Sequence, residues 1–170
     1  MRLWTIQDRP AHQRLLNRGV LYGDWRRVDA QCFKPAYKWL CDQMEKRGIR
    51  LRGRPPMWAW PHKPDMRTSA HNYRGKNGVV LLELEVPDEL VLLSHFNAWH
   101  CVLNDHYLVT RDDELEGMFD HPRHAVEASW QLVFDRGAMA AIPGYDDLYQ
   151  ATFPTIKVEQ IVSARQFAAR

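Results

Sequence analysis

Two tryptophans two residues apart are the side chains of this sequence best suited to bind a flat molecule. Trp58 and Trp60 lie in the stretch "PPMWAWPHKPDMR". Alternate residues of a strand share one face, so the two indoles should point the same way. Flanking prolines are typical of a strand at the edge of a sheet. A single tryptophan usually packs in a core, but two indoles on one face of an edge strand fit a core poorly. We therefore expect an aromatic platform at residues 57–61.

Two polar side chains follow this platform in the loop "KPDMRTSAHNYRGKNG". Arg67 presents a fork of donors that suits phosphate, and His71 adds a second polar group. For both residues the alternative is a solvated loop position. The pair His95 and His100 has no metal-ligand spacing, so we expect no metal site and expect His100 to be buried with one hydrogen bond. The standard glycine-rich, zinc-protease and nucleophile motifs are absent.

The elements that must position these residues can be read from periodicity and turn signals. Alternation predicts strands over residues 2–7, 57–61, 79–86, 148–153 and 161–167, with 90–94 as a continuation or partner of 79–86. Helical spacing predicts helices that end at Gly19 and Gly48, a helix over 94–108, and another beginning near Asp120. Strands and helices mix without a βαβ rhythm. The fold class is therefore α+β with a mostly antiparallel or mixed sheet and flanking helices.

Bulk composition limits the classes of protein to consider. The 170 residues fit one domain, spanning 1–170, with 45% hydrophobic residues. No apolar run is long enough to cross a bilayer, so we expect no membrane association. Three cysteines without a CxxC pair indicate reduced thiols in a cytoplasmic protein. The net charge of +2 excludes a strong global attraction to nucleic acid, although residues 46–54 carry five basic residues and no acid. A solvated helix end and loop is the commoner explanation of such a stretch.

Several segments together resemble a family of uncharacterised bacterial and phage domains of unknown function. They are "WTIQ", "GVLYGD", "FKPAYKWL", "PPMWAW", "LLELEVPDELVLLSHFNAWHCVLN" and "YQATFP". This resemblance covers nearly the whole chain and implies relatives without implying an activity.

The order of elements is also similar to that of the ADP-ribosyltransferase superfamily. The stretch "RLWTIQ … NRGVLYGD" resembles its opening strand and helix, "PMWAWP" its second strand, and "LYQATFPTIKVEQIVSARQF" its late strand, turn and last strand. This resemblance implies a split sheet and a site for NAD, whose nicotinamide would stack on Trp4, Tyr22, Trp58 or Trp60. It also assigns the catalytic positions to Thr5, where the family has histidine or arginine, and to Gln150, where active members have glutamate.

Cleavage of the bond between nicotinamide and ribose passes through an oxocarbenium-like state that negative charge stabilises. Gln150 can bond a ribose hydroxyl but carries no charge. Either another carboxylate such as Glu83 or Glu85 serves, or transfer is slow, or the domain only binds. We therefore expect an ADP-ribosyltransferase-like domain that binds NAD or a related nucleotide and acts on a protein or nucleic-acid target. The alternatives are a non-catalytic nucleotide- or base-binding module and a protein–protein adaptor that uses the same aromatic residues.

Overall fold

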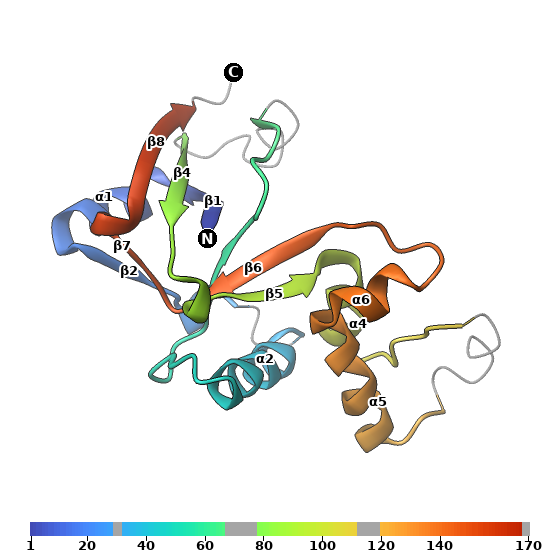
Figure 1. Cartoon of the computed structure of the whole chain (residues 1–170). Helices are drawn as coiled ribbons and strands as arrows, with labels where there is room; N and C mark the ends of the chain where they lie inside the picture. Colours follow the sequence, from blue (N-terminus) through green and yellow to red (C-terminus); the bar gives the residue numbers. More distant parts are fainter. Residues whose placement is uncertain (29–31, 67–77, 112–119, 168–170) are drawn as a thin grey trace.

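The computed structural model describes residues 1–28, 32–66, 78–111 and 120–167, and it has an α+β fold (Figure 1). Within these residues the chain forms five α-helices and three antiparallel sheets. The predicted fold class is thereby confirmed at the level of α+β with antiparallel sheets.

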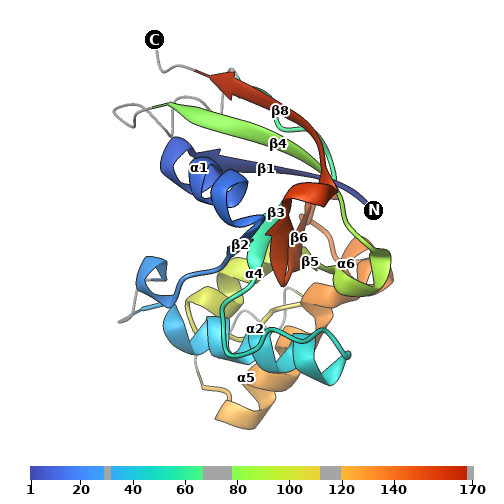
Figure 2. The ribbon, with the colours of Figure 1, turned by 90° about the vertical axis from the view of Figure 1, so that its left-hand side faces the viewer.

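The first sheet contains both the first and the last strand of the chain. Its order is β1 (Arg2–Asp8), β4 (Val79–Glu85), β8 (Ile161–Phe167), with all neighbours antiparallel. Helix α1 (Arg9–Arg18) lies against one face of this sheet (Figure 2). It begins where the Asp8 side chain accepts a hydrogen bond from the Ala11 amide, and it ends at Gly19 in the left-handed conformation.

The second sheet has the order β3 (Met57–Ala59), β6 (Tyr149–Phe153), β5 (Leu92–His95). A backbone bridge between Trp4 and Trp60 connects it to the edge strand of the first sheet. A third, two-stranded sheet pairs β2 (Val20–Tyr22) with β7 (Thr155–Lys157). The β-structure is therefore split, and its two larger sheets meet at one short junction.

Two main hydrophobic cores correspond to these two halves. One lies between α1 and the strands, and includes Leu3, Leu15, Leu82 and Phe153, each with an exposed fraction of zero. The other is built by helices below the second sheet and is rich in aromatic residues such as Trp99 and Trp130. Its helices are α2 (Lys34–Lys46), α4 (Phe96–Leu103), α5 (Arg123–Ser129) with the 3₁₀ segment Trp130–Phe134, and α6 (Arg136–Ala140).

All four segments expected to form strands around the site do so, at 2–8, 57–59, 79–85 and 149–153. The expected pairing of residues 90–94 with 79–86 is wrong, because β5 pairs with β6 in the other sheet. Pro87 and the 3₁₀ turn Asp88–Leu90 redirect the chain between them. The helix expected near Asp120 begins only at Arg123, after Pro122.

The helix expected over residues 94–108 is shorter than predicted, since α4 stops at Leu103 and Asp105 adopts a φ of 60°. The expectation that His100 is buried is also wrong. His100 is exposed on α4, whereas His95 has an exposed fraction of zero and caps the helix by accepting a hydrogen bond from the Ala98 amide. Among the described residues, no helix has the length and apolar character needed to cross a membrane.

Candidate functional site

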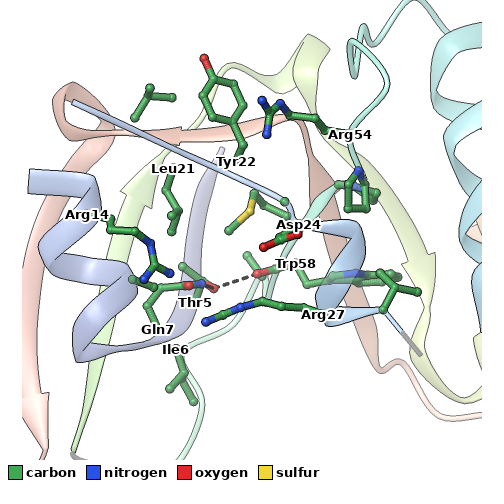
Figure 3. A pocket seen from close by; sticks show the side chains of 18 of the residues that line it. Thr5, Ile6, Gln7, Arg14, Leu21, Tyr22, Asp24, Arg27, Arg54 and Trp58 are labelled. Carbon is green, nitrogen blue, oxygen red and sulfur yellow. Dashed lines mark hydrogen bonds between the residues drawn. The ribbon is translucent and has the colours of Figure 1, made fainter. Parts of the chain in front are cut away.

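A cleft of about 930 Å³ opens where the two larger sheets meet (Figure 3). One wall comes from β1 and α1, and another from β2 and the 3₁₀ turn Trp25–Arg27 that follows it. The segment from Arg54 to Trp60 forms the opposite side, and Gln150 reaches the cleft from β6. The split between the sheets therefore creates the site, since no single element could line it.

The junction of β1 and β3 fixes one part of this cleft. The backbones of Trp4 and Trp60 exchange two hydrogen bonds, of 2.9 and 2.8 Å. Next to them, the Thr5 hydroxyl donates to the carbonyl of Trp58 at 2.8 Å, drawn as a dashed line in Figure 3, and accepts from the Gln7 side chain at 2.9 Å. Thr5 lines the cleft, but its hydroxyl proton is already used to fasten the two strands together.

The aromatic residues of the cleft are partly packed against one another. Trp58 and Trp60 are both half-buried and both line the cleft, as predicted. The Trp58 ring lies 5.4 Å from Trp99 and the Trp60 ring lies 5.1 Å from Phe96, so both indoles are turned toward α4. They form one wall rather than an open platform, because neighbouring aromatic rings already occupy part of each indole.

Two tyrosines extend this wall. Tyr37 of α2 contacts Trp58 in an edge-on arrangement, and burial raises the pKa of its hydroxyl. Tyr22 is more open, with an exposed fraction of 42%, and the guanidinium carbon of Arg54 lies 4.7 Å from the centre of its ring. Tyr22 is thus the aromatic side chain of the cleft most accessible to a ligand.

The electrostatic character of the cleft is strongly positive. Among the described residues, five arginines line it, against a single acidic residue, Asp24. Hydrogen bonds from Arg26 lower the pKa of the Asp24 carboxyl to about 2. Asp24 is therefore ionised and already neutralises one of the five arginines. The arginines are Arg14, Arg18, Arg26, Arg27 and Arg54.

Three of these arginines remain available to an anion. Arg27 is paired with Asp8 at 2.8 Å and Arg26 with Asp24 at 2.9 Å. Arg14 and Arg18 lie one helical turn apart on α1, and Arg54 stands on the opposite side of the cleft (Figure 3). None of the three forms an ion pair with another described residue. A ligand that enters between them would meet uncompensated guanidinium groups from two sides.

Gln150 is, with Thr5, one of two buried polar residues among the described residues that line the cleft. Its exposed fraction is 6%, and no described residue offers a hydrogen-bond partner to its Nε2. The hydroxyl of Ser94, directly across the strand pair, likewise has no partner among the described residues. A buried amide without a partner costs free energy, so this position is suited to a ligand that accepts a hydrogen bond.

The structure brings together five of the eight residues that the sequence singled out. Thr5, Tyr22, Trp58, Trp60 and Gln150 all line the cleft. Trp4 does not, because its side chain packs with Met66 and Phe167 in a separate small cluster. Arg67 and His71 lie outside the described residues.

Sequence reasoning missed the arginines of α1 and of the turn after β2. Arg14 and Arg18 are four residues apart and each follows a buried residue, Ala11 or Leu15, by three positions, so all four lie on one side of α1, where the two arginines are exposed. That spacing was visible in the sequence, but nothing in it indicated that this face borders a cleft. Within the described ranges, no group of three or more histidine, cysteine, aspartate or glutamate side chains could hold a metal ion.

A comparison with protein families matches most of the chain. Residues 2–121 match the model of a family described as a domain of unknown function (DUF3841). No curated protein matches the chain, and no solved structure does. The family match includes the walls of the cleft from β1 to Trp60 but ends before β6, which supplies Gln150.

Proposed function

The chain belongs to this family of domains of unknown function (DUF3841), and from its cleft we propose that it binds NAD or a related nucleotide as an ADP-ribosyltransferase-like domain. The observation that carries the proposal is the combination found in one cleft. Aromatic rings, unpaired arginines and a buried amide without a partner line the same space. A nucleotide needs these three kinds of group for its base, its phosphates and its hydroxyl groups.

The size and lining of the cleft support a ligand of this class. Ligand pockets are typically about 300–1,000 Å³ and mostly apolar, with a few polar groups that orient the ligand. The volume of about 930 Å³ lies near the upper end of that range. Trp58, Trp60 and Tyr22 offer aromatic surface for a ring, and the guanidinium groups of Arg14, Arg18 and Arg54 suit the oxygens of a diphosphate.

The two positions that the resemblance assigns to catalysis also support the proposal. Thr5 from the first strand and Gln150 from a late strand line the same cleft, although they are far apart in the sequence. Neither Glu83 nor Glu85 lines it. Glu83 instead accepts a hydrogen bond from Ser163 and pairs with Arg2. The loss of one electrostatic stabiliser of the transition state typically costs about a hundred- to a thousandfold in rate, so any transfer is expected to be slow.

The test combines calorimetric binding of NAD with an assay of nicotinamide release. We expect the wild type to bind NAD, and Gln150→Ala to lower the affinity by about 1 kcal/mol, the value of one neutral hydrogen bond. Gln150→Glu should increase nicotinamide release, because it adds negative charge where the ribose cation develops. Gln166→Ala is the matched control, since Gln166 is exposed on β8 and does not line the cleft. Absence of NAD binding in the wild type and in all variants would refute the proposal.

A specific observation favours a second candidate, a non-catalytic nucleotide-binding module. Asp24 is the sole carboxylate that lines the cleft from the described residues, and its charge is neutralised by Arg26. A site of this kind can bind a phosphate-bearing ligand without stabilising a ribose cation. NAD binding without nicotinamide release, in both the wild type and Gln150→Glu, would favour the non-catalytic module over an ADP-ribosyltransferase.

A further inference from the structure

The positive charge of the cleft continues beyond its walls along the loop between α2 and β3. We define the basic rim as Arg50, Arg52 and Arg54 of this loop. Ile49 and Leu51 are buried, with exposed fractions of 3% and 4%, whereas the arginines between and after them are exposed. The alternation of inward and outward side chains therefore directs the guanidinium groups of the rim into solvent.

The basic rim is held in a fixed position next to the cleft. The indole Nε1 of Trp25 donates to the carbonyl of Gly53 at 2.8 Å, and the Arg54 amide bonds the carbonyl of Leu51 at 3.2 Å. Trp25 begins the 3₁₀ turn that forms another wall of the cleft. The rim and that wall thus belong to one structural unit, so a ligand that contacts the rim is brought to the mouth of the cleft.

The charges of the rim are not compensated by the rest of the described protein. Neither Arg50 nor Arg52 forms an ion pair with a described residue, in contrast to Arg26 and Arg27. They also do not line the cleft, so a nucleotide bound inside it would not neutralise them. The net charge of the chain is only +2, which makes this cluster a local feature rather than part of a generally basic surface.

We propose that the basic rim and Tyr22 bind a single-stranded nucleic acid and lead it to the mouth of the cleft. A chain of phosphates fits guanidinium groups that extend along a loop, whereas a single nucleotide would use only those inside the cleft. Tyr22 is 42% exposed and carries Arg54 over its ring, which is the type of surface on which an unpaired base stacks. An acidic protein surface would use the arginines but not the stacking surface. The inference names the macromolecular partner of the cleft, and it rests on the proposed function only for the reaction that this partner would undergo once bound.

The test measures the fluorescence anisotropy of labelled single strands of RNA and DNA of about 16 nucleotides, the upper end of the site size of one nucleic-acid-binding fold. A duplex of the same length and poly-glutamate serve as competitors. We expect single strands to bind more tightly than the duplex. Each neutralised phosphate contributes about 0.7 to the slope of log K against log salt. The double variant Arg50→Gln, Arg52→Asn should therefore reduce that slope by about 1.4.

Two further variants separate the contribution of base stacking on Tyr22 from that of positive charge in general. Tyr22→Ala should weaken single-strand binding by about tenfold, as expected for the loss of one stacked base. The control Arg2→Gln, Arg165→Gln removes the same number of charges from the sheet β1-β4-β8, outside the cleft and the rim, and should leave binding unchanged. Asparagine is used at position 52 because Arg52 has a φ of 54°, which asparagine tolerates well.

The outcomes of these measurements separate this inference from the proposed function. No binding of any oligonucleotide at low salt, or an equal loss in the control variant, would overturn the inference even if NAD binds. Equal affinity for duplex and single strand would overturn the stacking role of Tyr22, and competition by poly-glutamate at equal charge would indicate an acidic protein partner instead. Oligonucleotide binding that depends on the rim, without any binding of NAD, would support the inference and refute the proposed function.

Discussion

Gly23 lies in one wall of the cleft, directly against the backbone of Pro55 in the opposite wall. A Cβ atom at this position would lie 2.0 Å from the carbonyl oxygen of Pro55 and 2.9 Å from its carbonyl carbon. Both contacts involve backbone, which cannot move aside as a flexible side chain can. Any side chain at position 23 must therefore push the turn after β2 away from the strand that carries Trp58.

We predict that Gly23→Ala destabilises the protein by about 1–3 kcal/mol, the typical cost of overpacking. The measurement is the free energy of unfolding in urea. Gly137→Ala is the control, because its Cβ would meet the Asp135 carboxylate at an ordinary 3.5 Å and because alanine suits α6 better than glycine does. Equal stability of Gly23→Ala and the wild type would contradict the close contact.

The individual residues of the site differ in how far the sequence revealed them. Trp58 and Trp60 could be predicted because strand alternation places both on one side. Their contacts with Trp99 and Phe96 could not, since these depend on how α4 packs beneath the second sheet. The resemblance predicts that Trp4 belongs with them, but Trp4 alternates with Thr5 in β1 and packs against Met66 and Phe167 instead.

At the scale of elements, α1 shows how local signals translate into structure. The sequence predicts a helix that ends at Gly19, and Gly19 is its C-cap, while Asp8 caps its start and Pro10 lies in its first turn. By contrast, the partner of β5 could not be predicted, because residues 90–94 could pair equally well with either neighbour by hydrophobic pattern. Pro87 and the 3₁₀ turn Asp88–Leu90 direct β5 to pair with β6, and the geometry of this turn depends on the tertiary structure.

The cap of α1 also gives a pH-dependent prediction. Burial raises the pKa of Asp8, but the Ala11 amide and the Arg27 guanidinium lower it by more, so its pKa lies below the ordinary value. A carboxyl whose pKa is lowered by folding stabilises the protein above its unfolded pKa of about 3.9, and loses this contribution as the pH falls through the folded pKa.

We therefore predict that the wild type is more stable than Asp8→Asn near pH 7, and that the difference in stability shrinks as the pH falls below about 4 toward the folded pKa of Asp8. Asparagine keeps the helix cap but not the charge. Asp8→Ala, which removes both, should lose a further amount of up to about 2 kcal/mol at every pH. Urea unfolding between pH 3 and pH 7 measures all three proteins. A constant difference between the wild type and Asp8→Asn across this range would show that the charge of Asp8 contributes nothing.

At the scale of the whole molecule, the cleft depends on strands from both ends of the chain. The family match ends at residue 121, but β6, β7 and β8 follow it. β6 pairs with β3 and β5, β7 pairs with β2, and β8 pairs with one edge of β4. Among the described strand pairs, only β1 with β4 is formed by two strands of the matched region. The matched region alone therefore completes none of the three sheets.

We predict that a fragment of residues 1–121 does not fold, whereas a chain ending at Phe167 does, because it keeps every strand that the structure describes. Far-ultraviolet circular dichroism and a urea titration distinguish the two. The chain of 170 residues and the chain ending at Phe167 should unfold cooperatively, and the fragment should show no transition. A cooperative transition of the fragment would mean that the second sheet is dispensable for folding.

The position of β6 in the centre of its sheet has a consequence for synthesis of the protein on the ribosome. At about 5–20 residues per second, the 170 residues emerge over roughly ten seconds or more. Tyr149 of β6 follows Ala59 of β3 by 90 residues and His95 of β5 by 54. For about 5–18 s and about 3–11 s, respectively, these strands lack the one that will lie between them, and the apolar residues that will contact β6 remain open to water and to other nascent chains. Molecular chaperones that shield such segments are therefore expected to matter more for the yield of this protein than the modest size of its cores would indicate.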